Sequence, residues 1–256
     1  MTRKFAITIA YDGTRFGGWQ IQPNATTVQQ VLVDAIAQAT SEQVHVQGSG
    51  RTDSGVHAVG QVGAFVLQNW RANSDNLIQA INRYLPRDVV ICDCREVVLS
   101  FDPIRQAKSK RYRYTIRNAI FPNPMSHRYH WCIPKALDVE SMRSASEFIL
   151  GTHDFKSFET QGSPRRSTTR TVYDLTIQRV ESLGGVELWI EVEADGFLYN
   201  MVRNIVGALW TVGSGRYGPR WIKTYLEMKE RGTSSLTAPP QGLCLMLVCY
   251  PECVYL

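Results

Sequence analysis

Hydrophobic and polar residues alternate along several short stretches of the chain, a pattern typical of half-buried β-strands. The first of these stretches is Phe5 to Tyr11. Further along, apolar residues recur at every third or fourth position, which predicts amphipathic helices. Val28 to Ala39 has this spacing, and Thr26 or Thr27 directly before it is suited to cap a helix that runs to about Thr40.

Both halves of the chain have the same order of predicted elements: strand, helix, strand, strand, helix, strand, with one additional helix in the second half. In the first half we expect strands at residues 5–11, 44–47, 61–67 and 89–94, and helices at 27–40 and 74–84, the latter capped by Ser74. In the second half we expect strands at residues 111–117, 171–179, 186–193 and 243–250, and helices at 138–150, 197–212 and 219–231.

This order is the split β-α-β pattern of ferredoxin-like and RNA-recognition folds. No low-complexity linker separates the halves. We therefore expect an α+β protein in which an N-terminal half, residues 1–105, and a C-terminal half, residues 106–256, form one continuous, mostly antiparallel central sheet flanked by helices.

The composition is that of an ordinary globular protein. Of the 256 residues, 44% are hydrophobic and 20% are charged, which argues against extensive disorder. The net charge is only +5, so a surface for nucleic acid would depend on local clusters of basic residues. No apolar run approaches 18 residues and the N-terminus lacks a signal-peptide pattern. We expect no membrane span and a cytoplasmic protein.

Residues that commonly hold metals or nucleotide cofactors do not occur at the required spacings. The six cysteines include no Cys-x-x-Cys pair, and His127 and His130 have no acidic or cysteine neighbour at metal-ligand spacing. The Gly-rich segment Gly48 to Ala58 has neither the Gly-Lys-Ser/Thr end of a phosphate loop nor a dinucleotide fingerprint. We therefore expect no metal and no cofactor, and a reaction performed by ordinary side chains.

This Gly-rich segment between two predicted strands is the most informative part of the sequence. Its glycines permit positive φ angles and the close approach of another backbone or a ligand. Arg51, Thr52, Asp53 and His57 accompany them, and a plain connection between strands would be shorter and less polar. Asp53 is thus a candidate catalytic carboxylate. A structural role, in which Asp53 caps backbone N–H groups of a tight turn, explains the composition at least as well.

The predicted helix at residues 197–212 is apolar on nearly every face, so it should be buried. Its exceptions form one narrow polar stripe at helical spacing: Asn200, Arg203, Asn204, Gly207 and Thr211. A buried arginine is costly without an anionic partner, which would be a carboxylate or an RNA phosphate. Our hypothesis is that Arg203 pairs with Asp53. The alternative is a structural ion pair with another acid.

The predicted strand at residues 111–117 combines basic and aromatic residues. Alternation along the strand gives two faces, one with Arg111, Arg113 and Arg117 and the other with Tyr112, Tyr114 and Ile116. Such a mixture is suited to hold phosphates and to stack an extruded base. A half-buried strand with inward tyrosines and solvated arginines explains the pattern at least as well.

Six groups of residues follow one another in a characteristic order and spacing along most of the chain. They are Tyr11-Asp12-Gly13-Thr14 with Gly18-Trp19-Gln20 and Val28-Gln29, Gly50 to Ala58 with Gln61-Val62, Lys110 to Tyr114, Gly151 to Phe155 with Ser157-Phe158, Met201 to Gly207, and Gly242-Leu243. In these groups the sequence resembles the TruA family of tRNA pseudouridine synthases.

The resemblance implies a pseudouridine synthase fold and the cofactor-free conversion of uridine to pseudouridine in the anticodon stem-loop of tRNA, at nucleotides 38 to 40. It implies that Asp53 is the catalytic aspartate and Arg203 its basic partner. It further implies that Tyr112 contacts the target uridine and that Arg51 helps to hold the flipped nucleotide. A homodimer that grips the tRNA is also implied. Ser54 departs from the Ala usual after the catalytic Asp, and we expect it to add a hydrogen bond at most.

The residues themselves agree with this reaction, because an isomerisation transfers no group between molecules and needs no cofactor. A base must leave the stack to be reached, so aromatic and cationic side chains are expected around it. Two other functions stay open. A non-catalytic protein of tandem RNA-recognition-like modules would use the basic clusters but would not need Asp53. A carboxylate-dependent nucleotide hydrolase would need a second acid or a metal site, and neither accompanies Asp53 in the sequence.

Overall fold

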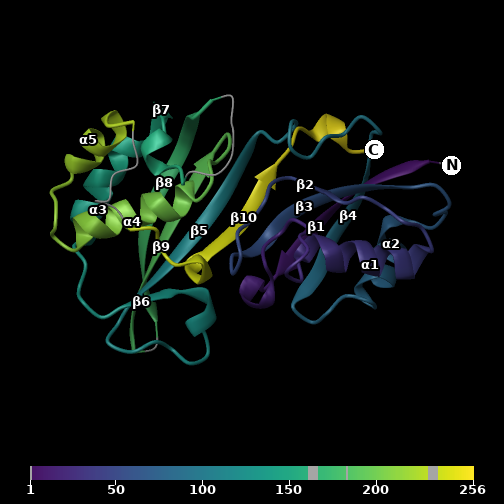
Figure 1. The fold of residues 1–256 in the computed structure, drawn as a ribbon, viewed down its shortest axis with the longest axis horizontal. Helices are drawn as coiled ribbons and strands as arrows, with labels where there is room; N and C mark the ends of the chain where they lie inside the picture. The colour runs from purple at the N-terminus through teal and green to yellow at the C-terminus, as the bar shows by residue number, and fades with distance from the viewer. Residues whose placement is uncertain (1, 161–166, 183, 230–235) are drawn as a thin grey trace. The chain divides into compact units, whose positions relative to one another are not determined.

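The chain forms two compact units (Figure 1). The computed structural model describes residues 2–160, 167–182, 184–229 and 236–256. The first unit consists of Met1–Lys108 and Leu245–Leu256, and the second unit consists of Ser109–Cys244. In sequence, the second unit is thus inserted between two parts of the first. The division expected from the sequence, 1–105 and 106–256, differs from these units chiefly at the C-terminus.

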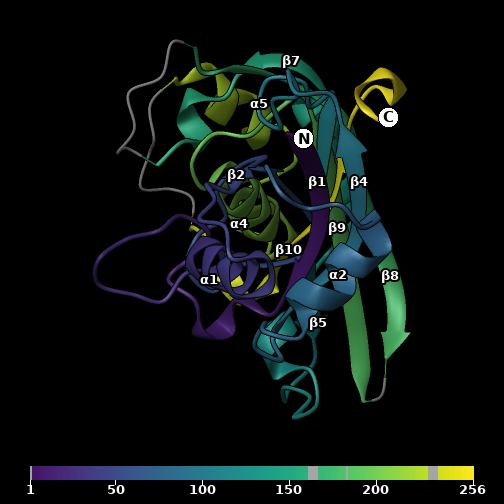
Figure 2. The ribbon, with the colours of Figure 1, turned by 90° about the vertical axis from the view of Figure 1, so that its right-hand side faces the viewer.

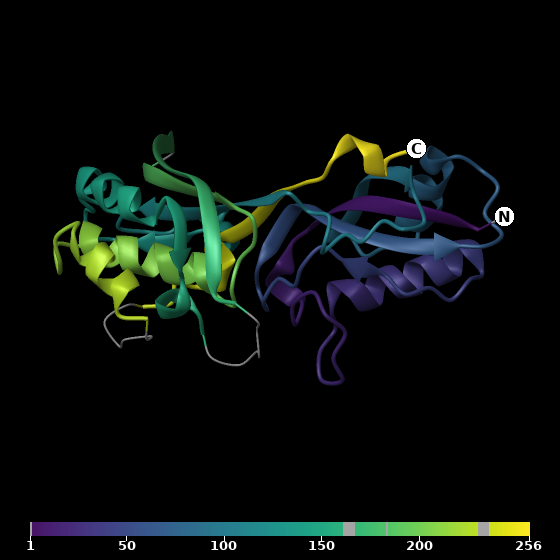
Figure 3. The ribbon, with the colours of Figure 1, turned by 90° about the horizontal axis from the view of Figure 1, so that it is seen from above.

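The first unit has the predicted order of elements. They are β1 (Arg3–Tyr11), the 3-10 turn η1 (Gly13–Arg15), α1 (Val28–Thr40), β2 (Gln47–Gly48), β3 (His57–Leu67), α2 (Ser74–Asn82), β4 (Val89–Val97), most of β10 (Leu243–Cys249) and η6 (Glu252–Val254). Strand β1 lies between β3 and β4 and pairs antiparallel with both. Strand β2 pairs antiparallel with β3, and β10 is the next neighbour of β3 in the sheet. Figures 2 and 3 show α1 alongside one face of β1.

The hydrophobic pattern accounts for α1. Thr27 caps the helix as predicted, because its side chain accepts a hydrogen bond of 3.3 Å from the amide of Gln30. Val28, Leu32 and Ile36, which share one face of the helix, have no exposed surface. The helix therefore buries its apolar face in the core of the first unit, and this burial is the main source of its stability.

The second unit repeats the order strand, helix, strand, strand, helix with additional short elements, and the last strand expected for it, β10, belongs mostly to the first unit. Its elements are β5 (Ser109–Asn118), η2 (His127–Tyr129), β6 (Trp131–Ile133), α3 (Val139–Ser146), η3 (Glu147–Ile149), β7 (Gly151–Asp154), η4 (Lys156–Phe158), β8 (Thr169–Ser182), β9 (Gly185–Ala194), α4 (Met201–Gly213), α5 (Trp221–Glu227) and η5 (Pro240–Gly242). Strand β9 pairs antiparallel with β5 and β8, and β7 pairs antiparallel with β8. The short β6 pairs parallel with β5.

Helix α4 is buried on nearly every side, as its composition predicts. Ile205, Val206 and Leu209 have no exposed surface, and the polar Asn204 and Thr211 are also buried. Figure 1 shows the helix lying across the strands of the second unit. Because so much of α4 is enclosed, each polar side chain on it needs a hydrogen-bond partner inside the unit.

The prediction of an α+β fold with mostly antiparallel strands and flanking helices is confirmed. Asn73, not Ser74, caps α2, since its side chain accepts a hydrogen bond of 2.9 Å from the amide of Asn76. The helix predicted from residue 197 begins at Met201, because Asn200 has a left-handed backbone (φ 60°) that an α-helix cannot include.

Other predicted boundaries differ by a few residues. The strand expected at 44–47 is reduced to β2, and the short strands β6 and β7 were not predicted. The helix expected at 219–231 is α5, and residues 230 and 231 lie outside the described part of the chain. In the described ranges, no helix is both long and apolar enough to cross a membrane.

Candidate active site

Asp53 begins a tight turn in the loop between β2 and β3. The amide of Val56 donates a hydrogen bond of 3.1 Å to the carbonyl oxygen of Asp53. Between them Gly55 has a φ of 78°, a conformation that is strained for residues with a side chain. The turn therefore requires glycine at this point. The side chain of Asp53 is half-buried, which suits a carboxylate that is held in place yet accessible to a substrate.

Thr52, directly before Asp53, anchors the loop in the core of the first unit. The side-chain hydroxyls of Tyr11 and Thr52 share a buried hydrogen bond of 2.8 Å. The amide of Trp19 donates to the carbonyl oxygen of Thr52 at 3.0 Å. Because Thr52 is bound through both its side chain and its backbone, the main chain of Asp53 has little freedom to move.

Two glycines allow the neighbouring segments to approach this loop closely. Gly18 has a φ of 98°, and a Cβ atom there would lie only 2.7 Å from the carbonyl oxygen of Thr52. A Cβ atom on Gly48 would lie 2.5 Å from the indole ring of Trp19. Side chains at these positions would force the segments apart. The glycines and Trp19 thus support the loop that carries Asp53.

The start of the loop is fixed by Gln61 of β3, whose side chain is fully buried. Its amide oxygen accepts a hydrogen bond of 2.6 Å from the hydroxyl of Ser49, and its amide nitrogen donates to the carbonyl oxygen of Gly50 at 3.1 Å. Ser49, Gly50 and Thr52, which lead to Asp53, are therefore all tied to the core. The residue groups around Tyr11, Trp19 and Gln61, on which the family resemblance rests, serve here as its structural support.

Arg51 and Ser54 lie on either side of this anchored segment and are exposed. The hydroxyl of Ser54 donates to the carbonyl oxygen of Phe16 at 3.2 Å. This is the additional hydrogen bond expected from a serine in place of alanine. The exposed guanidinium of Arg51 is placed as a cation that can meet a phosphate from the solvent side.

Tyr112 lies on the buried face of β5 in the second unit and is 9% exposed. Its ring meets the ring of Phe197 edge-on, with the ring centroids 5.1 Å apart and an interplanar angle of 88°. Edge-to-face contacts of this kind stabilise aromatic pairs. Tyr112 is therefore a rigidly held aromatic group on a regular strand, which is how binding sites keep their geometry.

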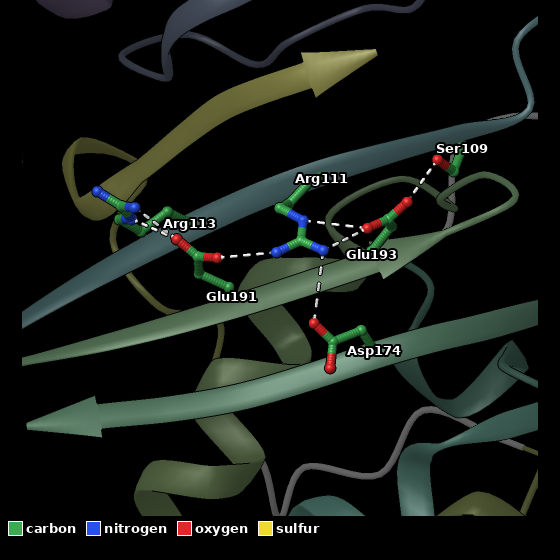
Figure 4. Close-up of polar contacts among 6 residues, drawn as sticks. All are labelled: Ser109, Arg111, Arg113, Asp174, Glu191 and Glu193. Atoms are coloured by element: carbon green, nitrogen blue, oxygen red, sulfur yellow. Dashed lines mark hydrogen bonds and ion pairs between the residues drawn. The ribbon is translucent and has the colours of Figure 1, made fainter. Parts of the chain in front are cut away.

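Arg111 and Arg113 lie on the opposite face of β5 and pair with acidic residues of neighbouring strands (Figure 4). In the antiparallel register, Arg111 is opposite Glu193 and Arg113 is opposite Glu191. Arg111 Nη2 lies 2.6 Å from a carboxylate oxygen of Glu193 and 3.5 Å from one of Asp174. Arg113 Nε donates to Glu191 at 2.7 Å.

These pairs compensate the positive charges of the strand. The hydroxyl of Ser109 donates to Glu193 at 2.6 Å, and this bond together with the Arg111 guanidinium lowers the pKa of Glu193. The expectation of inward tyrosines is confirmed, whereas the expectation of solvated arginines is wrong. Three carboxylates surround these two guanidinium groups, so their positive charge is compensated within the sheet.

Arg203 lies in the first turn of α4, where two neutral acceptors fix its guanidinium group. Arg203 Nε donates to the carbonyl oxygen of Ala238 at 2.7 Å, and Nη1 donates to Asn200 Oδ1 at 2.8 Å. The amide of Ala238 also donates to the carbonyl oxygen of Arg203 at 3.1 Å. Burial raises the pKa of the Tyr114 hydroxyl, and the charge of Arg203 acts in the opposite direction. The positive charge of Arg203 therefore acts on the Tyr114 hydroxyl in the interior of the second unit.

The rest of the polar stripe joins α4 to adjacent segments. Asn204 donates to the carbonyl oxygen of Phe158 at 2.7 Å and accepts a hydrogen bond of 2.7 Å from the hydroxyl of Thr237. A Cβ atom on Gly207 would overlap the carbonyl oxygen of Leu236. The stripe thus satisfies polar groups that the apolar faces of the helix cannot satisfy.

The predicted site residues are divided between the two units: Asp53 and Arg51 belong to the first, and Tyr112 and Arg203 to the second. Asn200 was not predicted to be a site residue, although its place three positions before Arg203 in the polar stripe was a usable signal. Ala238 had no such signal, because it binds Arg203 through its backbone. Within the described ranges, no group of three or more His, Cys, Asp or Glu residues could hold a metal ion.

Comparison with known proteins adds an independent finding. The tRNA pseudouridine synthase family matches residues 7–103 and 145–251, which include Asp53 and Arg203. The tRNA pseudouridine synthase A of Thermoanaerobacter sp. (strain X514) is 45% identical over 97% of this chain and 100% of its own length. The protein of the same name from Geotalea uraniireducens (strain Rf4) is 42% identical over 97% of this chain and 100% of its own.

A more distant relative has a similar extent of match. The tRNA pseudouridine synthase A of Chlamydia muridarum (strain MoPn / Nigg) is 41% identical over 98% of this chain and 94% of its own length. Among solved structures, a Cbf5-Nop10-Gar1 complex matches with a TM-score of 0.31 and 13% identity over 81% of this chain and 54% of that one, which is too weak to bear on the fold. The family match and the near full-length relatives show that this chain belongs to the TruA family of tRNA pseudouridine synthases, which are isomerases.

Proposed function

We propose that the protein converts uridine to pseudouridine at nucleotides 38 to 40 of the anticodon stem-loop of tRNA, as a cytoplasmic homodimer and without a cofactor. Family membership over nearly the whole chain supports the reaction and the substrate class. The structural observation that carries the proposal is the loop of Asp53. It offers one half-buried carboxylate directly after a segment that is tied to the core through Gly50 and Thr52.

The reaction rearranges one nucleotide without adding or removing atoms. The bond between N1 of uracil and C1′ of the ribose breaks, the base turns, and a new bond joins C5 to C1′. The proton on C5 is then lost and N1 gains one, so the composition and the oxidation state do not change. No redox or group-transfer partner enters this balance. The protein must supply a group that acts on the sugar and a pocket for the turning base.

Asp53 is the proposed catalytic residue. Its carboxylate either attacks C1′ as a nucleophile or removes the proton on C2′ as a base, and both routes require the ionised form. We infer that Arg203 pairs with Asp53 and favours that form by opposite charge. The guanidinium of Arg203 suits this role because Ala238 and Asn200 already fix its plane through neutral acceptors.

Tyr112 and Arg51 are the proposed substrate-binding residues. The ring of Tyr112, braced by Phe197, provides an aromatic face against which the extruded uracil can stack. Its hydroxyl group can also take part in the transfer of the C5 proton. Arg51, two residues before Asp53 and exposed, would bind a phosphate of the flipped nucleotide.

The decisive experiment compares the native protein with Asp53→Asn on unmodified tRNA, with pseudouridine mapped chemically and tRNA binding measured in parallel. We expect the variant to bind tRNA normally and to form no pseudouridine. Asp34→Asn is the control, since Asp34 lies on the surface of α1, where it accepts a hydrogen bond from Gln30, and it should retain full activity. Pseudouridine formation by Asp53→Asn would refute the catalytic role. A native protein that binds tRNA but never isomerises it would favour the non-catalytic alternative.

The target positions and the dimer are tested separately. In tRNA substrates with a single uridine-to-cytidine change at nucleotide 38, 39 or 40, the mark should disappear only at the changed position. Light scattering of the native protein should give twice the chain mass of 28.9 kDa. Modification elsewhere in the tRNA would contradict the proposed targets, and full activity at the mass of one chain would contradict the dimer.

A further inference from the structure

Asn200 has an unusual backbone conformation directly before α4. Its φ of 60° and ψ of 8° lie in the left-handed region. Among residues with a side chain, asparagine and aspartate adopt this region most readily. A positive φ at the residue that precedes the helix with Arg203 sets the direction in which the Asn200 side chain points. This conformation is therefore part of the geometry around Arg203.

Both ends of the Asn200 amide are engaged by different parts of the second unit. Asn200 Oδ1 accepts a hydrogen bond of 2.8 Å from Arg203 Nη1, and Asn200 Nδ2 donates to the hydroxyl of Thr160 at 3.1 Å. The amide of Thr160 in turn donates to the carbonyl oxygen of Tyr199 at 3.1 Å. Asn200 thus connects the guanidinium group to the segment that follows η4.

A second contact completes the restraint. Arg203 Nε donates to the carbonyl oxygen of Ala238 at 2.7 Å, and Ala238 is itself bound to the helix through its amide. A planar guanidinium group held at two of its nitrogens by acceptors from separate segments can neither rotate nor shift along its plane without breaking a bond. Neither of these two acceptors is charged, so their role is to orient the guanidinium group.

We propose that Asn200 is a positioning residue for the reaction, which holds the guanidinium group of Arg203 in its working orientation and is itself held by Thr160. This inference rests on the proposed role of Arg203 as the partner of Asp53. It explains the choice of side chain at position 200. Glycine would accept the backbone but offer no amide, and alanine would offer neither a comfortable left-handed backbone nor the hydrogen bonds.

The first test is Asn200→Gly, which keeps the left-handed backbone and removes both amide contacts. We expect kcat to fall at least about 10-fold, because a misplacement of a charged group by about 1 Å costs up to about 100-fold in rate. The KM for tRNA should change by less than about threefold. The acid limb of the pH–rate profile should also move to higher pH, since a displaced Arg203 favours the ionised Asp53 less. A purely structural role would not move that limb.

Ser41→Gly is the matched control. Ser41 also has a φ of 60°, at the end of α1 in the first unit, so its replacement tests the effect of glycine at a left-handed residue remote in sequence from Arg203. We expect native kcat and a native pH profile. The positioning role is refuted if Asn200→Gly keeps kcat within about twofold of the native value, or if the substitution changes only the KM for tRNA.

Thr160 provides a second, independent test that leaves position 200 intact. Thr160→Val removes the hydroxyl that accepts from Asn200, and it should lower kcat in the same direction as Asn200→Gly. Thr160→Ser restores the hydroxyl and should recover most of the lost rate. Equal rates for the valine and serine variants would overturn the proposal. Arg203→Met, measured in the same series, separates the role of Arg203 from the role of Asn200. Native activity in Arg203→Met refutes the role of Arg203 itself, whereas an inactive Arg203→Met beside an unaffected Asn200→Gly refutes only the positioning.

Discussion

The side-chain hydroxyls of Tyr11 and Thr52 lie 2.8 Å apart in the interior of the first unit, one residue before Asp53. Through this contact the central strand β1 holds the loop that carries the proposed catalytic carboxylate. Sequence position alone would not relate residue 11 to residue 53. The bond shows how a residue without a chemical role contributes to the geometry of the site.

Tyr11→Phe removes this bond with little change in volume. Because the Thr52 hydroxyl would lose a buried partner, we expect the free energy of unfolding to fall by about 1–2 kcal/mol and kcat to fall severalfold as the loop loosens. Thr40→Val is the control, since it removes a hydrogen bond of 2.8 Å to the carbonyl oxygen of Ile36 at the end of α1 in the same unit. It should cost similar stability at native kcat. Equal losses of kcat in both variants would mean that stability alone explains the effect.

Gly18→Ala should damage both stability and activity. The substitution places a Cβ atom 2.7 Å from the carbonyl oxygen of Thr52 at a residue whose φ is 98°, so the loop must move or the backbone must be strained. We expect a loss of at least about 2 kcal/mol in the free energy of unfolding, measured by denaturant titration. Gly218→Ala has open space and no positive φ, and it should change stability by less than about 0.5 kcal/mol.

Glu193→Gln should destabilise the protein in a pH-dependent manner. The Ser109 hydroxyl and the Arg111 guanidinium lower the pKa of Glu193 in the folded state. A lowered pKa gives stability that is present above the pKa of the unfolded chain and is lost as the pH falls through the folded value. We expect the variant to be about 1 kcal/mol less stable than the native protein at pH 7, with the difference vanishing as the pH falls below the usual range of glutamate.

The control for this prediction is Glu181→Gln. Glu181 pairs with Arg179 at 3.3 Å, but both side chains are largely exposed (77% and 60%), and such pairs contribute little. Its stability should follow the native curve at every pH. A difference between Glu193→Gln and the native protein that stays constant down to pH 3 would show that the lowered pKa does not contribute to stability.

Arg51 and Arg113 should respond differently to removal of their charge. Arg51→Met should weaken tRNA binding severalfold and reduce the slope of log K against log salt concentration by roughly 0.7–0.9, as expected for one lost phosphate contact. Arg113 pairs with Glu191 and lies over the ring of Trp189 at 4.2 Å, so Arg113→Met should lower stability and leave the salt dependence unchanged. Equal changes of slope in both variants would contradict the assignment of a phosphate contact to Arg51 and of an internal ion pair to Arg113.

Much of the fold could be predicted from hydrophobic spacing, because each long element buries one regular face. The spacing of Val28, Leu32 and Ile36 located α1, and the alternation in β5 placed Tyr112 and Tyr114 inward. The short strands β6 and β7 were not predicted, because alternation of hydrophobic and polar residues cannot be recognised over three or four residues. The start of α4 was misplaced because apolar residues also precede Asn200, and hydrophobic spacing does not reveal its left-handed backbone.

The candidate site was predictable only in part. Asp53 stood out as a carboxylate in a long, polar, glycine-rich loop, and Arg203 stood out as a charged residue on a buried helix. The pairing of Arg111 and Arg113 did not, because their partners Glu191 and Glu193 are about 80 positions away. The complementary alternation of arginine in one strand and glutamate in the other was a signal, yet it becomes readable only once the two strands are known to be neighbours.

The insertion of the second unit has a consequence for how the chain is made. Strand β10 is the neighbour of β3 in the sheet, and a Cβ atom on Gly60 would overlap the carbonyl oxygen of Met246. Residues 245–256 follow the whole inserted unit in the chain, so the first unit cannot be completed until the second has been synthesised. Every residue of the inserted unit is made before them. A stop codon just before residue 245 would therefore leave the unit with Asp53 incomplete, although that residue is synthesised early.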